Sequence, residues 1–197
     1  MEALLRLPRR ASYGDYLAVE QNSEHRHEFL DGVIVAMAGG SDEHNAIAGR
    51  LAMLLGMRAQ GPCRYYTSDQ RFWIAARARG RYADGSIICG PPQHPAHDEQ
   101  ATTNPTVVIE VLSPSSEGDD DGDKRSDFQS LPSVQAYVLV AQDQRCAKVY
   151  RRAAAGTWQT ATYRDGDRFE LPMLSTAISV AEIYEGILDT AGRSLLR

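Results

Sequence analysis

The alternation of apolar and polar residues near the N-terminus predicts a β-hairpin that is followed by a helix. Residues 27–37 read HEFLDGVIVAM, in which Asp31-Gly32 separates two short apolar runs. Asp-Gly between such runs is typical of a two-residue hairpin turn. From residue 42 to residue 58 the apolar residues recur three and four positions apart, which predicts a helix. Gly61-Pro62 follows and ends it.

Short apolar runs bounded by turn residues predict that much of the remaining chain forms strands. The run 106–112, TVVIEVL, is apolar except for one acid, which is typical of a strand buried on both faces. Residues 90–104 are rich in Pro, His and polar side chains and predict a surface loop, and residues 113–121 predict an exposed turn or loop. The other strands are expected at 63–67, 71–75, 86–89, 136–140, 147–150, 157–163 and 168–171, and the other helices at about 13–21, 123–131 and 179–188.

This mixture of elements, without an internal repeat or a linker, predicts one α/β or α+β domain over residues 1–197. We expect a central mixed β-sheet flanked by helices. Hydrophobic residues make up 43% of the chain, which is enough to bury a sizeable core. No apolar run approaches the roughly 20 residues that span a bilayer. The N-terminal segment does not resemble a secretory signal, so we expect a cytoplasmic protein with no membrane partner.

Charge and cysteine content narrow the function classes. The net charge of −5 argues against a protein that coats nucleic acid regardless of sequence, because such a protein needs a basic surface. It does not exclude an enzyme that contacts nucleic acid over a small patch. The three cysteines, Cys63, Cys89 and Cys146, are an odd number at wide spacing without a CxxC pair. We therefore expect reduced thiols.

Two acids beside apolar strands are the first candidates for chemistry. Glu110 lies inside TVVIEVL, where an ionised carboxylate without a partner is costly, and Asp84 begins the apolar run of YADGSIICG. On adjacent strands the two carboxylates would repel each other, and a divalent cation is the usual remedy. Oxygen-only ligation favours magnesium or manganese. The plainer interpretations are an exposed edge position for Glu110 and a turn residue before Gly85 for Asp84.

Three further residues are candidates for the site only if they lie near Asp84 and Glu110. Lys124 opens a predicted helix and is a candidate to hold an attacking water or to stabilise charge on a phosphate. Glu28 precedes the hairpin turn and is a candidate metal ligand. His44 lies at the start of the helix over 42–58 and is a candidate accessory residue. Their plainer roles are a solvated lysine, a half-exposed hairpin position and helix capping.

Other possible sites fail on their spacing. The acidic stretch 117–123 contains five of the 26 acids, but Phe128 stands where a calcium loop needs a bidentate Glu, so a solvated acidic loop is favoured. The histidine pairs have no cysteine or carboxylate at a spacing suited to a zinc site. No Walker, GxGxxG or GxSxG motif occurs. The stretch RARGR, with Arg77, Arg79 and Arg81, suits either phosphate contact or an exposed hairpin tip.

Five segments of the chain occur in a characteristic order: HEFLDGVIVAMAGGSDEHNAIAGRL, YADGSIICGP, NPTVVIEVLSPSS, DKRSDFQSLPSVQAYVLVAQD and KVYRR. Together they resemble the Uma-two family of bacterial proteins, which are described as restriction endonucleases and belong to the PD-(D/E)XK nuclease superfamily. The resemblance extends from about Tyr13 to Leu188, and the core is therefore expected at about 13–188. It implies a restriction-endonuclease-like fold.

The resemblance also implies roles for individual residues. Asp84 matches the Asp of the PD half-motif, and Glu110 matches the acid of the second half. Both would be catalytic and would bind Mg²⁺, for which Mn²⁺ can substitute, with the backbone carbonyl of Val111 as a further ligand. Glu28 matches an acid on the N-terminal element that often completes such sites. Lys124 matches a catalytic lysine on the helix after the second acid.

Two departures from the superfamily pattern leave the function open at this point. Ala83 replaces the proline before the Asp, and Leu112 stands where the usual lysine follows the second acid. The favoured function is a magnesium-dependent endonuclease acting on nucleic acid, with DNA as the expected substrate, Arg81 and His44 as accessory residues, and a homodimer as the expected assembly. The alternative is a non-catalytic module, binding nucleic acid or protein, that retains the nuclease fold. An enzyme acting on another phosphate-bearing substrate is a third hypothesis.

Overall fold

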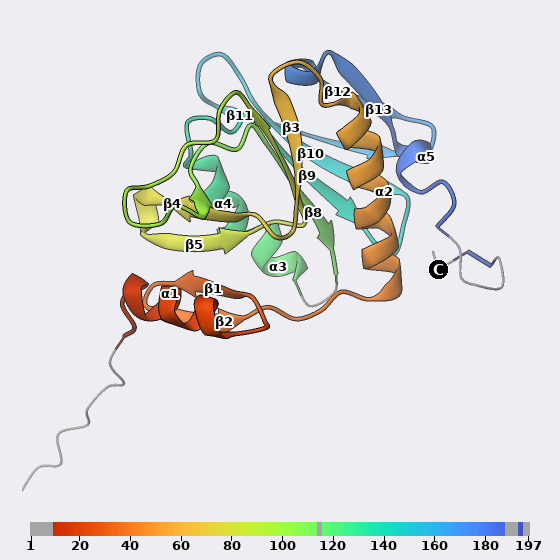
Figure 1. The fold of residues 1–197 in the computed structure, drawn as a ribbon. Coiled ribbons are helices and arrows are strands. Elements are labelled where there is room, and N and C mark those ends of the chain that lie inside the picture. Colours follow the sequence, from red (N-terminus) through yellow and green to blue (C-terminus); the bar gives the residue numbers. More distant parts are fainter. Residues whose placement is uncertain (1–9, 114–115, 188–192, 195–197) are drawn as a thin grey trace, which may run out of the picture.

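A six-stranded mixed sheet forms the centre of the computed structural model, which describes residues 10–113, 116–187 and 193–194 (Figure 1). Its strand order is β11-β10-β9-β8-β6-β3, in which β8 and β9 are parallel and the other neighbours are antiparallel. The expected central mixed sheet flanked by helices is thereby confirmed. Its strands are β3 (Cys63–Thr67), β6 (Gly85–Cys89), β8 (Val107–Leu112), β9 (Ala136–Ala141), β10 (Cys146–Arg152) and β11 (Trp158–Arg164).

Both faces of this sheet are covered, as the continuous apolar run of β8 predicts. Successive side chains of a strand point to opposite faces, so Ile109 and Val111 join one core and Val108 joins the other. The first core lies beneath α2 (Asp42–Arg58) and α5 (Val180–Ile183). The second core includes Phe128 of α4 (Asp123–Gln129). The same alternation directs Glu110 to the face that α4 covers.

A second sheet of five strands, in the order β2-β1-β5-β4-β7, packs beside the first. In the β1–β2 hairpin, Asp31 and Gly32 both have positive φ, 53° and 83°, which is the type I′ turn that the Asp-Gly pair predicts.

The remaining elements are β1 (His27–Leu30), β2 (Val33–Ala36), β4 (Arg71–Ile74), β5 (Arg79–Tyr82), β7 (Ala101–Thr102), β12 (Arg168–Leu171), β13 (Thr176–Ser179), α1 (Tyr13–Asn22), α3 (Glu117–Asp120), and the 3₁₀ turns η1 (Ala75–Arg77) and η2 (Pro172–Leu174).

Strand β5 corrects the interpretation of RARGR as an exposed hairpin tip. Arg79 is 9% exposed and Arg81 is 1% exposed, and both donate hydrogen bonds to the fully buried carboxylate of Asp127 on α4. Arg81 also donates to Glu28 of β1 and to Asp119 of α3. Buried guanidinium groups need several acceptors of this kind, and the acceptors here come from distant parts of the chain.

The segment 90–104 is a loop for most of its length, as expected, but it contains a buried acid. Asp98 is 5% exposed and accepts two hydrogen bonds of 2.9 Å from the guanidinium of Arg71 on β4. Tyr13 of α1 donates a third bond, of 2.7 Å. Burial would raise the pKa of Asp98, but the bonds from Arg71 and Tyr13 outweigh it and lower the pKa below the usual value. The loop therefore ties α1 to the five-stranded sheet.

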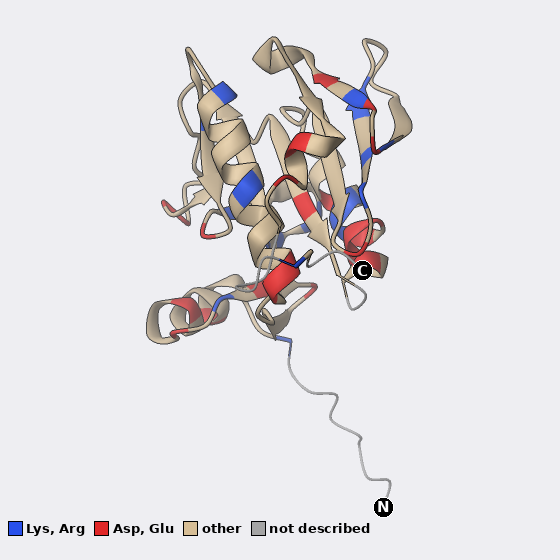
Figure 2. Cartoon of the chain, turned by 90° about the vertical axis from the view of Figure 1, so that its right-hand side faces the viewer, with Lys and Arg blue, Asp and Glu red and all other residues tan. Residues whose placement is uncertain are grey.

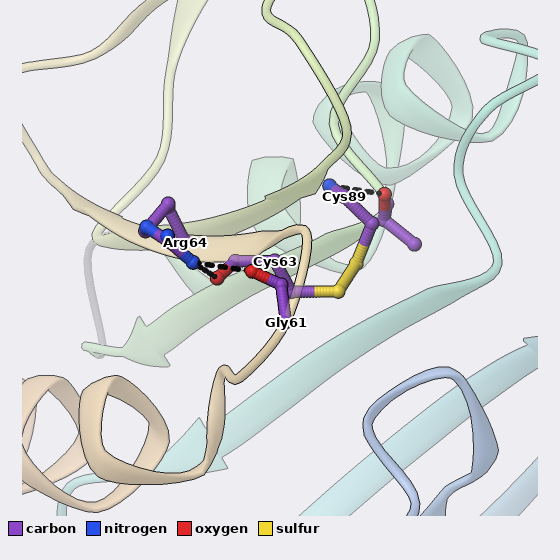
Figure 3. Close-up of a disulfide and its surroundings, with 5 residues drawn as sticks. Gly61, Cys63, Arg64 and Cys89 are labelled. Carbon is purple, nitrogen blue, oxygen red and sulfur yellow. Dashed lines mark hydrogen bonds between the residues drawn. A yellow bond between two sulfur atoms is a disulfide. The ribbon is translucent and has the colours of Figure 1, made fainter.

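The cysteines also differ from expectation, because Cys63 and Cys89 form a disulfide (Figure 3). The two residues lie directly opposite each other in the antiparallel pair β3–β6, a register that the sequence alone does not reveal. Cys146 is a free cysteine. The expectation of reduced thiols is thus wrong for this pair.

Two sequence-based boundaries also change. The helix expected over 123–131 ends at Gln129, and the helix expected to reach residue 188 ends at Ile183, while residue 188 itself lies outside the described part. No helix in the described ranges is both long and apolar enough to cross a membrane.

We expect the Asp98→Asn variant to lose about 3 kcal/mol of unfolding free energy, because it leaves the Arg71 charge buried with fewer acceptors. The folded-state pKa of Asp98 is lowered, so its contribution is complete above about pH 5 and is lost as the pH falls through the folded pKa. The wild type should therefore lose more stability on acidification than the variant. Urea unfolding at several pH values measures both effects.

The matched control is Asp69→Asn, because Asp69 pairs with Arg26 at an exposed position and should contribute less than about 1 kcal/mol. Equal losses in the two variants would contradict the role assigned to Asp98.

For the cysteines, we expect a thiol-alkylating reagent to modify one cysteine of the denatured, unreduced protein and all three after reduction, because Cys63 and Cys89 are paired. Mass spectrometry of the intact protein counts the adducts. Three adducts before reduction would show that the pair is not oxidised in the purified protein.

Candidate active site

Five of the sequence-predicted site residues line one cleft of about 390 Å³, whereas Val111 and Arg81 are not in its lining. It lies where the β1–β2 hairpin and its linker to α2 approach α3 and the end of β8 (Figure 1). Its lining has one apolar wall and one acidic wall. The lining residues are Glu28, Val35, Ala36, Met37, Ala38, Gly39, Gly40, Ser41, His44, Asp84, Glu110, Ser113, Ser116, Asp119, Asp120, Lys124 and Gln142.

Asp84 lies just before β6 and beside the C-terminal end of β8. Its Oδ2 accepts a 2.7 Å hydrogen bond from the backbone N–H of Val111, and its own N–H donates a 3.3 Å bond to Oε2 of Glu110. The N–H and the C=O of a strand residue point to the same side, so the Val111 carbonyl also faces Asp84. These contacts bring together three of the four expected metal ligands, and the fourth, Glu28, lines the same cleft.

Glu110 is 1% exposed, and its Oε1 lies 3.0 Å from Nζ of Lys124. This oxygen accepts no well-aligned hydrogen bond from any described residue. Burial raises the pKa of Glu110 well above its usual value even though the Lys124 charge opposes the shift. An ionised Glu110 therefore needs more positive charge than Lys124 alone supplies.

Lys124 reaches back from α4 and contacts two carboxylates. Its Nζ lies 3.0 Å from Glu110 and 3.3 Å from Oδ1 of Asp120 on α3. Burial would lower the pKa of Lys124, but the negative charges of Glu110, Glu28 and Asp120 outweigh it, so its pKa is raised and the ammonium stays protonated. Lys124 thus acts as a cation and a hydrogen-bond donor, and not as a base.

Asp120 is a site residue that the sequence analysis missed. The stretch 117–123 was expected to be a solvated acidic loop, but Asp120 is 4% exposed, and burial raises its pKa. The backbone carbonyl of Asp120 also accepts a 2.8 Å bond from the hydroxyl of Tyr137. Asp120 ends α3 and Lys124 lies in α4, so this ion pair joins two helices, and the spacing of four residues would signal it only in one continuous helix.

Glu28 and Arg81 lie at the base of the cleft as a bonded pair. Glu28 accepts a 2.7 Å bond from Arg81 and a 3.1 Å bond from the backbone N–H of Tyr82. Because the guanidinium of Arg81 is 1% exposed and also binds Asp119 and Asp127, it orients acids and does not face an incoming phosphate.

His44 combines both of the roles considered for it. Its backbone N–H donates to the hydroxyl of Ser41, the N-cap residue of α2, while its Nε2 lies 3.0 Å from Oδ2 of Asp84. The hydrogen bond with Asp84 raises the pKa of His44. At Asp84, burial raises the pKa, but the His44 bond and the charge of Lys124 help to lower it below its usual value, so Asp84 stays ionised.

The cleft as a whole has an excess of negative charge. Five carboxylates line it, against one lysine and one histidine. Elsewhere acidic and basic segments are interspersed along the chain (Figure 2). In the described ranges no three His, Cys, Asp or Glu side chains form a group that could hold a metal ion. The all-oxygen donor set and the under-compensated Glu110 nevertheless fit a hard divalent cation.

Two known proteins are similar in sequence to this chain over most of its length. A protein from Synechocystis sp. (strain ATCC 27184 / PCC 6803 / Kazusa) named "Uncharacterized protein slr1290" is 33% identical over 174 residues, which is 88% of this chain and 90% of the relative. A second protein from the same organism, "Uncharacterized protein sll1609", is 33% identical over 148 residues, which is 73% of this chain and 82% of the relative.

The fold has a counterpart among solved structures. The crystal structure of "a putative nuclease belonging to DUF820" from Anabaena variabilis ATCC 29413 matches with a TM-score of 0.66 over 82% of this chain and 90% of that chain, at 16% identity. The model of the Uma2 family, described as "Putative restriction endonuclease", matches residues 13–182 and so includes every cleft residue discussed above. Sequence and fold therefore lead to one conclusion: this chain belongs to the Uma2 family.

Proposed function

We propose that the cleft binds Mg²⁺ through Asp84, Glu110 and the carbonyl of Val111, and that it hydrolyses phosphodiester bonds of nucleic acid, DNA in particular. The observation that carries the proposal is that Asp84 and Lys124, from separate parts of the chain, both lie within hydrogen-bonding distance of Glu110. The family description and the solved relative point to the same reaction class.

A divalent cation bound there would polarise a phosphate oxygen and lower the pKa of a bound water. The side chains of the cleft would hold the cation and orient the reacting groups. Asp84 is held ionised by His44 and by the N–H of Val111, so its orientation is fixed before a ligand arrives. Glu110, whose ionised form lacks sufficient compensation, gains that compensation from the cation.

Lys124 replaces the lysine that the superfamily carries at the position of Leu112. Its protonated Nζ, 3.0 Å from Glu110, is close enough to donate a hydrogen bond to an attacking water or to a negatively charged phosphate. Glu28 would act from the base of the cleft, where its bonds to Arg81 and to Tyr82 fix its orientation. Glu28, Glu110 and Lys124 are buried and Asp84 is partly buried, which limits the motion of these side chains and helps precise alignment.

One observation favours the alternative of a non-catalytic module. Lys124 already lies between Glu110 and Asp120, so both buried acids have a positively charged neighbour without any metal. Metal affinity therefore discriminates between the two functions.

We expect wild-type protein to bind Mn²⁺ in a calorimetric titration and Asp84→Asn to bind it at least about ten-fold more weakly, because one ligand charge is lost. Asp69→Asn, which changes an exposed acid outside the cleft, is the control and should bind as the wild type does. Equal binding by wild type and Asp84→Asn would place the metal elsewhere, and no binding by the folded wild type would favour the non-catalytic module.

We expect Asp84→Ala and Glu110→Ala to abolish cleavage, and Lys124→Ala to lower kcat by about 100-fold or more, because one charged donor is lost. Cleavage of labelled oligonucleotides in Mg²⁺ measures the rates, and circular dichroism checks the fold. Arg125→Ala is the control for Lys124→Ala, because Arg125 is the neighbouring cation but does not line the cleft. Wild-type rates in all three site variants would contradict the mechanism.

A further inference from the structure

A second hollow of about 350 Å³ continues from the candidate active site. Ser113 and Gln142 line both spaces, so the two are direct neighbours. The residues that line only the second hollow come from β8, β9, β10, β11 and the segment around α3. They are Leu112, Glu117, Asp121, Leu139, Ala141, Asp143, Gln144, Cys146, Lys148 and Thr162.

The strand register shows how this hollow is aligned with the candidate site. Glu110 on β8 lies opposite Leu139 on β9, Leu139 lies opposite Lys148 on β10, and Lys148 lies opposite Thr162 on β11. The four residues therefore form one row across one face of the sheet. With neighbouring strands about 4.8 Å apart, the hollow begins about 5 Å from Glu110 and extends to about 14 Å.

The lining of the second hollow suits an uncharged, flat group better than a phosphate. Leu112, Leu139 and Ala141 supply apolar surface. The charged residues are three acids and Lys148, whose Nζ is already paired with Asp121 at 2.6 Å. An anion would meet net negative charge there, whereas the side-chain amides of Gln142 and Gln144 can donate to or accept from the polar edge of a heterocycle.

We propose that this second hollow receives an unpaired nucleobase next to the scissile phosphate, and that the substrate is therefore an unpaired nucleic-acid strand or region. This inference rests on the proposed nuclease function. A base in a duplex is stacked on both sides and paired along its edge, so it reaches such a hollow only after it leaves the helix. An unpaired base enters without that cost.

Binding to matched oligonucleotides tests the inference separately from cleavage. A labelled 12-residue DNA strand is compared with the same strand in a duplex, by fluorescence anisotropy in Ca²⁺, and the comparison is repeated with RNA. We expect the unpaired strand of DNA, RNA or both to bind at least about ten-fold more tightly than its duplex. Equal or tighter binding of the duplex in both series would overturn the inference.

A variant that fills the hollow tests its location. Thr162 is exposed and lines the hollow, whereas Thr160 is exposed on the same strand and face but does not line it. We expect Thr162→Trp to raise the Kd for the unpaired strand at least about five-fold relative to Thr160→Trp. An unchanged or lower Kd would overturn the inference.

Hydrolysis of bis(4-nitrophenyl) phosphate distinguishes failure of the inference from failure of the proposed function, because this diester carries no nucleobase. We expect the wild type to hydrolyse it in Mn²⁺ whether or not the second hollow receives a base. Hydrolysis without any preference for the unpaired strand would overturn the inference alone. Absence of hydrolysis of this diester and of every oligonucleotide would overturn the proposed function, and with it the inference of a substrate.

Discussion

The guanidinium of Arg81 is the group on which the shape of the cleft depends. It donates to Glu28 of β1, Asp119 of α3 and Asp127 of α4, and it is almost completely buried. A buried cation of this kind is tolerated only while its acceptors stay in place, so it holds the hairpin and both helices around the same point. The site residues that these elements carry are thereby fixed relative to one another.

Burial of charged groups in the cleft costs electrostatic free energy, which an apolar core does not require. Glu110 and Asp120 are buried carboxylates whose pKa values are raised by burial, and Lys124 is the cation that lies between them. Apolar residues at these positions would pack in the core without this desolvation penalty. Charged residues replace apolar ones at buried positions most often where chemistry or recognition requires them, and this cleft is such a place.

Periodicity in the sequence predicted the elements whose stability depends on their own pattern. The hairpin at Asp31-Gly32, the helix of residues 42–58 and the doubly buried strand around Glu110 are examples. The expected burial of Glu110 and its pairing with Asp84 first suggested a site that includes Lys124, and the resemblance to a known family then implied a role for each residue.

The features that sequence analysis missed depend on partners far along the chain. Strand β5 contains buried arginines that look exposed until their carboxylate partners are known. Asp98 in the loop over 90–104 is buried because Arg71 meets it there. The pairing of Cys63 with Cys89 needs the register of β3 and β6, and the burial of Asp120 needs the position of α3 against the sheet.

The parallel pairing of β8 with β9 has a consequence for how the family can vary. Parallel neighbours require a crossover, and in this chain the crossover carries Asp119, Asp120, Lys124 and Asp127. Surface connections generally accept insertions and deletions. This one cannot change length between α3 and α4 without moving Lys124 away from Glu110, so length variation among functional homologues should be concentrated in other connections.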